Sequence, residues 1–207
     1  MLAIPIVPLI LAAGDSKRMG YPKALLPLGF DTFLSRILKT LKAIGMPKPV
    51  IILGKAASVI QPQLRGWPAD IYINPNPDRG QLSSIQLAIA SIPPEFDAGM
   101  IWPVDQPAVS ESLVRCLVEL FLNSGSRIAC PMYGNKRGHP AIFHRALFRE
   151  FMEARLEEGP KKIIARYQAA TTLLPTEESA SVQDIDTPED YEALTGESLN
   201  AALARTR

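Results

Sequence analysis

Short apolar runs, each suited to one buried strand, alternate along this chain with stretches of helical periodicity. The runs at 7–12 and 50–53 are continuously apolar, which is typical of strands buried on both faces. Between them, apolar residues recur at helical spacing over 33–44, after an Asp-Thr pair and before a glycine. This strand-helix-strand order predicts an α/β domain with a mainly parallel sheet and helices on both faces.

The same alternation continues to about residue 132. The expected elements are a helix over 55–65 that Pro62 weakens, a strand at 71–73, a helix over 82–92, a strand at 100–102, a helix between Ser110 and Gly125, and a strand over 127–132. Residues 133–180 interrupt the alternation, and we interpret them as a substrate-side insertion within a single domain of residues 1–207. Residues 197–207 are expected to form a frayed terminal helix.

Composition excludes several classes of protein. Apolar residues make up 47 % of the 207 residues, enough for a core and too many for a disordered chain. A net charge of +1 gives no basic surface for nucleic acid or membrane. The two cysteines, interpreted as core thiols, are too few for a disulfide framework or a cysteine-rich zinc site. No export signal or membrane span is apparent, so a cytoplasmic location is expected.

A glycine-containing loop follows the first strand, with the sequence LAAGDSKRMGYPK over residues 11–23. It matches neither the Walker loop nor the dinucleotide-binding fingerprint. Its small residues would still let backbone N–H groups approach an anion, and Arg18 and Lys23 add positive charge. The same composition suits a solvated basic loop, so the residues alone leave a phosphate site open.

Carboxylates occupy two further positions of interest. Asp105, in a Pro-Val-Asp-Gln-Pro stretch, is expected at a strand end, where it would suit Mg²⁺ or bond its own backbone in a turn. Asp184 and Asp186 precede a capping box opened by Thr187, and neither is needed for that cap. Both are expected on a strand that precedes the helix, facing the same side, with Asp186 as a second carboxylate for the metal.

Two more segments have both a functional and a structural interpretation. Residues 79–84 precede a helix, so their backbone donors can hold a base or phosphate or simply cap the helix. His139 lies in a rigid Gly-His-Pro loop, where it can contact substrate or serve only the packing.

Together these motifs resemble the nucleotidyltransferases that activate molybdopterin, within the MobA-like NTP transferase superfamily, and most closely their cytidylyltransferase branch. The opening loop, Asp105-Gln106-Pro107, Gly138-His139-Pro140 and the motif at 186–190 follow the family's order over residues 7–195. The resemblance implies a Rossmann-like three-layer domain of the GT-A-like type and dependence on Mg²⁺. It also implies transfer of CMP from CTP to the terminal phosphate of molybdopterin, with release of pyrophosphate. The chain departs from the family at Trp102-Pro103-Val104, where a glycine more often precedes the aspartate.

The resemblance also implies roles for individual residues. Carried over by position, the residues that would hold the triphosphate are Gly14, Arg18 and Lys23, and those that would hold Mg²⁺ are Asp105 and Asp186. The residues that would lie near the base and ribose are Ala12, Ala13, Gly80 and Ser84. His139 would lie on the acceptor side. Arg18, Lys23 and Asp105 would be catalytic. A recipient molybdoenzyme, or the chaperone that inserts its cofactor, is the implied protein partner.

Other functions stay open at this stage. Ala12-Ala13, where guanylyltransferases of this family usually have Ala-Gly, favours CTP over GTP. The alternatives are a guanylyltransferase on the same cofactor and a nucleotidyltransferase that acts on a sugar or alcohol phosphate. A different class is a catalytically inactive chaperone that only binds the cofactor.

Overall fold

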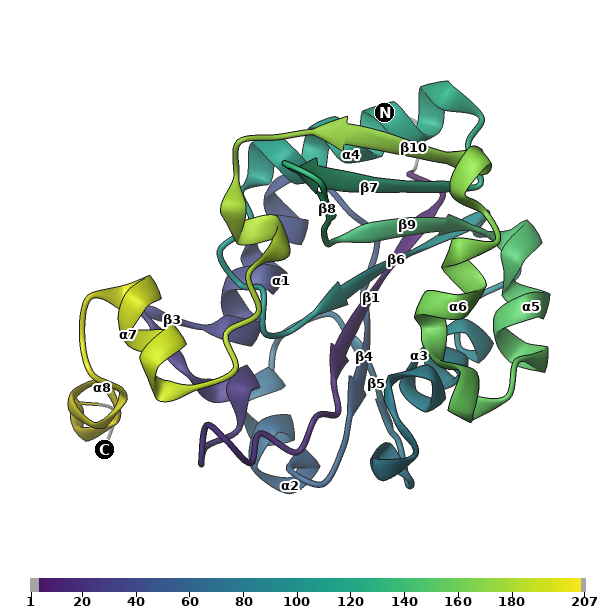
Figure 1. Cartoon of the computed structure of the whole chain (residues 1–207). Coiled ribbons are helices and arrows are strands. Elements are labelled where there is room, and N and C mark those ends of the chain that lie inside the picture. The colour runs from purple at the N-terminus through teal and green to yellow at the C-terminus, as the bar shows by residue number, and fades with distance from the viewer. Residues whose placement is uncertain (1–3, 206–207) are drawn as a thin grey trace.

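A computed structural model describes residues 4–205 and is built around one large mixed sheet (Figure 1). The sheet has eight strands. Its order is β10 (Thr171–Pro175), β7 (Ile128–Tyr133), β9 (Ala141–His144), β6 (Ala98–Pro103), β1 (Ile6–Ala12), β4 (Val50–Leu53) and β5 (Asp70–Ile73), with β8 (Lys136–Arg137) beside β7. Within this sheet of the described residues, β8 and β9 run antiparallel to their neighbours and the other pairs are parallel. A separate hairpin joins β2 (Pro27–Leu28) to β3 (Asp31–Thr32).

Helices cover both faces of the sheet, so the predicted three-layer α/β architecture is confirmed (Figure 1). One face carries α1 (Phe33–Ala43), α2 (Ala57–Ile60), α4 (Glu111–Ser124), α7 (Pro188–Thr195) and α8 (Leu199–Arg205), and the other carries α3 (Gln81–Ala90), α5 (Phe148–Glu153) and α6 (Gly159–Ala165). Successive residues of β1 alternate between the two cores: Ile10 packs with the first group, Leu9 and Leu11 with the second.

The helix boundaries follow from local chemistry. Thr32 caps α1 by accepting a hydrogen bond from the Ser35 backbone, and the Ser35 side chain returns one to Thr32. Ser110 caps α4, which ends at Ser124 and is followed by Gly125 with φ at 63°. These ends agree with the sequence prediction. The helix expected over 55–65 is shorter, because α2 stops at Ile60 and a 3-10 turn takes over at Gln61–Leu64, where Pro62 lies.

Residues 133–180 contribute more to the sheet than the sequence suggested. The apolar piece 141–143 is part of β9, which lies between β6 and β7. The strand β10, which sequence reasoning missed, pairs with β7 at the edge of the sheet. The strand expected at 184–186 is absent: residues 183–186 of the described chain lie in no helix or strand.

Two smaller expectations concern the cysteines and the terminus. Cys130 is buried, which raises the pKa of its thiol to about 11, but Cys116 is exposed and is not the core thiol that its helical position suggested. At the carboxyl end, Leu199 and Ala202 of α8 are buried, and residues 206–207 lie outside the described part. Over 4–205, no helix is long and apolar enough to cross a bilayer.

The order of the strands reverses at one point in the sheet. From β1 the chain moves to β4 and β5 on one side, and then returns to β6 on the other side of β1. The carboxyl ends of β1 and β6 therefore flank a point where the strand order reverses. In open α/β sheets this is the preferred position for a ligand.

Candidate active site

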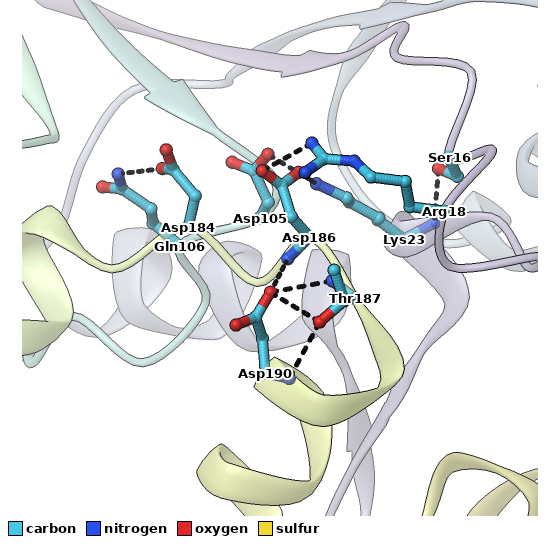
Figure 2. Close-up of polar contacts among 9 residues, drawn as sticks. All are labelled: Ser16, Arg18, Lys23, Asp105, Gln106, Asp184, Asp186, Thr187 and Asp190. Carbon is cyan, nitrogen blue, oxygen red and sulfur yellow. Dashed lines mark hydrogen bonds and ion pairs between the residues drawn. The ribbon is translucent and has the colours of Figure 1, made fainter.

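The loop after β1 is closed by its own hydrogen bonds. The backbone N–H of Lys23 donates to Ser16 Oγ at 3.2 Å, and that of Gly20 donates to the Ser16 carbonyl at 2.9 Å. Ser16 and Gly20 both have positive φ, at 48° and 70°. This tight conformation brings the backbone of Lys23 back to Ser16, and the Lys23 side chain points toward Asp105 and Asp186 (Figure 2).

Lys23 lies between two carboxylates that are far apart in sequence (Figure 2). Its Nζ is 2.9 Å from Asp105 Oδ2 and 2.5 Å from Asp186 Oδ1. Arg18 reaches the other oxygen of Asp186, with Nη2 at 2.8 Å from Oδ2. The Lys23 side chain is only 12 % exposed, whereas that of Arg18 is 67 % exposed. Four of the residues singled out in the sequence thus meet at one point.

The electrostatics of this cluster keep its ion pairs charged. Burial by itself lowers the pKa of Lys23, but the charges and hydrogen bonds of Asp105 and Asp186 outweigh it and hold the pKa above its usual value. The hydrogen bond from Lys23 lowers the pKa of the Asp186 carboxyl against the opposing effect of burial, and the charge of Arg18 adds to the lowering. Near neutral pH, Lys23 and Asp186 are therefore an ion pair.

The capping box of α7 fixes the backbone beside Asp186. Asp190 Oδ2 accepts the backbone N–H of Thr187 at 2.8 Å and that of Asp186 at 3.0 Å. Thr187 Oγ1 in turn accepts the N–H of Asp190 at 3.2 Å. The predicted cap is confirmed, and it does more than start a helix: it holds the segment that carries a carboxylate of the cluster.

Asp184 does not share a side with Asp186, contrary to the period-two expectation. Residues 183–186 form no continuous ladder, and the one backbone bond there runs from Ile185 N–H to the Asp105 carbonyl at 3.0 Å. Asp184 turns away from the lysine and accepts a hydrogen bond from Gln106 Nε2 at 2.7 Å (Figure 2). Gln106 belongs to the Asp105-Gln106-Pro107 motif of the sequence, but no role was predicted for its side chain.

A cavity of about 310 Å³ opens over this cluster. It is lined by the opening loop, by Ala56 and Ile60 before and at the end of α2, and by Asp105 and Asp186. No group of three or more His, Cys, Asp and Glu side chains within 4–205 forms a ready-made metal site. However, Asp105 Oδ1 is buried and has no hydrogen-bond partner among the described residues. A buried, unpaired carboxylate oxygen beside a second carboxylate fits a divalent cation, which takes one or two protein carboxylates and completes its shell with phosphate and water.

The residues expected near the base and ribose are more scattered. Ala12 and Gly14 line the cavity, whereas Ala13 is 6 % exposed and packs in the core beneath α3. Gly80 precedes α3 with φ at 92°. Ser84 is buried and its Oγ accepts a hydrogen bond from Asn74 at 3.0 Å.

An exposed lysine connects the opening loop to the loop before α3. Lys55 Nζ is 3.4 Å from Asp15 Oδ2 and 2.8 Å from Asp78 Oδ1. The phosphate loop and the residues around Gly80 therefore lie on neighbouring parts of the surface, although Gly80 and Ser84 line no part of the cavity above Lys23.

His139 lies in a second cavity, of about 320 Å³, between β7, β9, α3 and α6. Its walls are mostly apolar and include Ile85, Phe143 and Phe151. Burial lowers the pKa of His139, although the charges of Asp184 and Asp105 act in the opposite direction. The adjacent Gly138 is required by space, because a Cβ there would fall 2.2 Å from the carbonyl oxygen of Ser181.

Comparison with known sequences identifies relatives of this chain. A family model described as the MobA-like NTP transferase domain matches residues 8–171. The purine catabolism protein PucB of Bacillus subtilis is 24 % identical over 198 residues, which make up 90 % of this chain and 94 % of PucB. The bifunctional IPC transferase and DIPP synthase of Rubrobacter xylanophilus is 30 % identical over 113 residues, 52 % of this chain, and the match covers only 26 % of that protein.

Solved structures show the same fold. The crystal structure of Rv0371c from Mycobacterium tuberculosis has a TM-score of 0.83 at 27 % identity and covers 95 % of this chain and 100 % of its own. A complex of Rv0371c with manganese has a TM-score of 0.78 at 26 % identity, over 93 % and 98 % of the two chains. The molybdopterin-guanine dinucleotide biosynthesis protein A of Archaeoglobus fulgidus, at 17 % identity and a TM-score of 0.67 over 91 % and 96 %, shares the fold.

Proposed function

The chain belongs to the MobA-like NTP transferase family, and from this premise we propose that it transfers CMP from CTP to the terminal phosphate of molybdopterin. The observation that carries the proposal is the cluster of Lys23, Arg18, Asp105 and Asp186, which lies in an open cavity at the point where the strand order of the sheet reverses. A nucleoside triphosphate is strongly negative, and the positive side chains of Lys23 and Arg18 line the cavity where they can bind its phosphates.

The reaction needs no covalent enzyme intermediate. An oxygen of the acceptor phosphate attacks the α-phosphorus of CTP, the bond from that phosphorus to the bridging oxygen breaks, and pyrophosphate leaves with the electron pair. The attacking phosphate is already an anion, so no strong general base is required. The work of Lys23, Arg18 and Gly14 is to hold the triphosphate in line and to offset the charge on its phosphates.

Asp105 and Asp186 are the residues that would hold Mg²⁺. When bound, the ion neutralises charge on the phosphates. The unpaired Asp105 Oδ1 supports this assignment from the protein side, and the manganese complex of Rv0371c supports a divalent cation in a relative. Mg²⁺ as the physiological ion is part of the proposal.

The acceptor is proposed to enter the cavity that holds His139. This assigns residues 133–180, which supply β9, α5 and α6, to the acceptor side of a single domain of residues 1–207. Asp105 lines the nucleotide cavity and its charge acts on His139, so His139 lies within electrostatic reach of the nucleotide cavity. The product would pass to a recipient molybdoenzyme or to the chaperone that inserts its cofactor.

Base choice is assigned in this proposal to Ala12, Ala13, Gly80 and Ser84, which come from the end of β1, the loop after it and the start of α3. The Ala13 side chain packs in the core, so its methyl group does not narrow the nucleotide cavity, and base choice falls to backbone groups of the loop. A base without groups that match those backbone donors and acceptors would leave them unpaired, at a cost of about 1–3 kcal/mol. We expect CTP to be preferred over GTP.

The deciding experiment measures pyrophosphate release with each of the four nucleoside triphosphates, with and without molybdenum cofactor. The proposal expects release that requires cofactor, a divalent cation and CTP. A competition assay with equal CTP and GTP then identifies the base: a dominant GTP product would make the chain a guanylyltransferase. Binding of cofactor without any pyrophosphate release would indicate the inactive chaperone.

One observation favours a second acceptor class. The walls of the His139 cavity are mostly apolar, with Ile101, Phe143 and Phe151 among them. An alcohol phosphate with an apolar body would fill such a cavity better than a strongly polar acceptor. Release of pyrophosphate with an alcohol or sugar phosphate, and none with molybdenum cofactor, would favour this alternative.

A further inference from the structure

Gln106 is a buried amide that the proposed reaction does not use directly. It is only 3 % exposed, and it follows Asp105 in the short loop after β6. Burying an amide in such a place costs free energy unless its hydrogen bonds are made. The hydrogen-bond partners of the Gln106 amide therefore indicate its role.

The amide group has a fixed orientation. Asp184 Oδ1 lies 2.7 Å from the donor end of Gln106, and a carboxylate can only accept, so the nitrogen must face Asp184. The opposite end, Oε1, is buried and has no hydrogen-bond partner in the described part of the chain. Packing alone would favour an apolar side chain here, so the bond to Asp184 is the feature that explains a glutamine.

The backbone of Gln106 is held independently of its side chain. Trp102 Nε1 donates to the Gln106 carbonyl at 2.9 Å, and Val104 N–H donates to the Leu11 carbonyl at 3.0 Å. The loop that carries Asp105 is therefore fixed to β1 and β6. Loss of the Gln106 amide would leave Asp105 in place and would remove one of the contacts that hold the segment on the other side of the bond.

That segment is the one that carries Asp186. Residues 183–186 have no strand partners along their length. Besides the bond to Gln106, this segment is held by the Ile185–Asp105 backbone bond, by burial of the Ile185 side chain, by the α7 cap and by the ion pairs of Asp186. We infer that Gln106, through Asp184, is a positioning residue that sets the distance between the carboxylates of Asp105 and Asp186. This inference rests on the proposed function, in which the two carboxylates share a divalent cation.

The test compares Mn²⁺ binding, measured by calorimetry without acceptor, in the wild type and in Gln106→Met. Methionine keeps the length and removes the donor, without adding charge. Loss of a residue that orients a metal ligand weakens metal affinity by about 10–100-fold, and we expect the lower end of that range because the other anchors of the segment remain. We expect kcat to fall with the metal affinity, while KM for CTP changes little.

A reversed pair provides the rescue. In Gln106→Glu combined with Asp184→Asn, the asparagine donates to the glutamate, so the hydrogen bond and the total charge are both kept. The double variant should recover most of the wild-type Mn²⁺ affinity. Glu197 pairs with Arg205 far along the chain, and the control Glu197→Gln should leave Mn²⁺ binding unchanged.

The outcomes distinguish failure of the positioning role of Gln106 from failure of the proposed metal-dependent function. Wild-type Mn²⁺ affinity in Gln106→Met, even with a lower melting temperature, would mean that the amide serves stability only and would overturn the positioning role. Failure of the reversed pair to recover affinity in a folded protein would also overturn it. If the wild type and Asp186→Asn bind Mn²⁺ equally, the carboxylates hold no metal, and the metal-dependent function falls together with this inference.

Discussion

The two cavities of this molecule differ in how they are built. The cavity above Lys23 is lined by charged residues that are already paired with one another, whereas the cavity beside His139 is walled mainly by aliphatic and aromatic side chains. The first lies at the reversal point of parallel strands. The second lies where β9 runs antiparallel between β6 and β7.

This difference predicts a division of labour. In the charged cavity, side chains that now pair with one another would pair with the phosphates of the ligand instead. Because these side chains would stabilise charge on the reacting phosphates, substitutions there should alter the rate of nucleotidyl transfer. An apolar cavity binds by excluding water from a ligand of matching shape, so changes there should alter acceptor affinity. Each of the following variants tests one side of that division.

The largest effect is expected from Lys23→Ala. Lys23 is the least exposed cation of the charged cavity and contacts both carboxylates. Its loss should lower turnover by at least about 100-fold, as expected when a group that stabilises developing charge is removed. Steady-state pyrophosphate release measures the effect, and circular dichroism checks the fold. Lys48→Ala, which breaks an exposed pair with Asp70, is the control. Turnover near the wild-type value in Lys23→Ala would refute the assignment.

The next effect concerns the paired carboxylates. Asp105→Asn and Asp186→Asn should each weaken Mg²⁺ and Mn²⁺ binding by more than about 10-fold, which is the lower limit for residues that only orient a ligand. If both hold one ion, the double variant should lose less than the product of the single effects. Titration calorimetry provides the affinities. Asp184→Asn keeps an oxygen acceptor for Gln106 and should retain more activity than Asp186→Asn, and independent effects at 105 and 186 would exclude a shared ion.

The regular first half of the chain was predictable because its signals are local. Continuous apolar runs marked β1 and β4, and capping residues such as Thr32 and Ser110 marked helix starts within a residue. The strands of the second half gave weaker signals. β9 has four residues, and β10 is a half-buried edge strand whose sequence, TTLLP, has no alternation between its faces. Their positions depend on pairing with β6 and β7, which no local pattern records.

The candidate site shows the same limit. The motif order placed Arg18, Lys23, Asp105 and Asp186 in one function, and the structure brings their side chains together. Asp184 was misplaced because period-two alternation holds only where a ladder keeps a strand extended. The bond of Gln106 to Asp184 was not predicted, because the two residues lie 78 residues apart and no local pattern in the sequence connects them.

The apolar cavity should respond to a change of shape at its wall. Ala165, an exposed residue of α6, lines this cavity, so Ala165→Phe adds bulk without disturbing the core. We expect KM for the acceptor to rise by about 10-fold, the low end of discrimination by shape, with KM for CTP unchanged. Lys162→Phe, on the same helix but outside the cavity lining, is the matched control. A rise in KM for CTP alone would assign the cavity to the nucleotide instead.

The smallest effect is a pH dependence that belongs to the second cavity. Burial lowers the pKa of His139 below the usual 6.5, whereas Lys23 and Asp186 have pKa values displaced away from neutrality. As the pH falls below about 6.5, the unfolded chain binds a proton at His139 that the folded chain does not, so the free energy of unfolding decreases until the folded pKa is reached. Urea unfolding at pH 7.5, 6.5 and 5.5 should show this decrease in the wild type and a shallower one in His139→Gln.

Because the ion pair of Lys23 with Asp186 stays charged throughout this range, the difference between the two slopes reports on the apolar cavity alone. Equal slopes would mean that the imidazole is no more buried in solution than in the unfolded chain, and the cavity would then be open to water at His139.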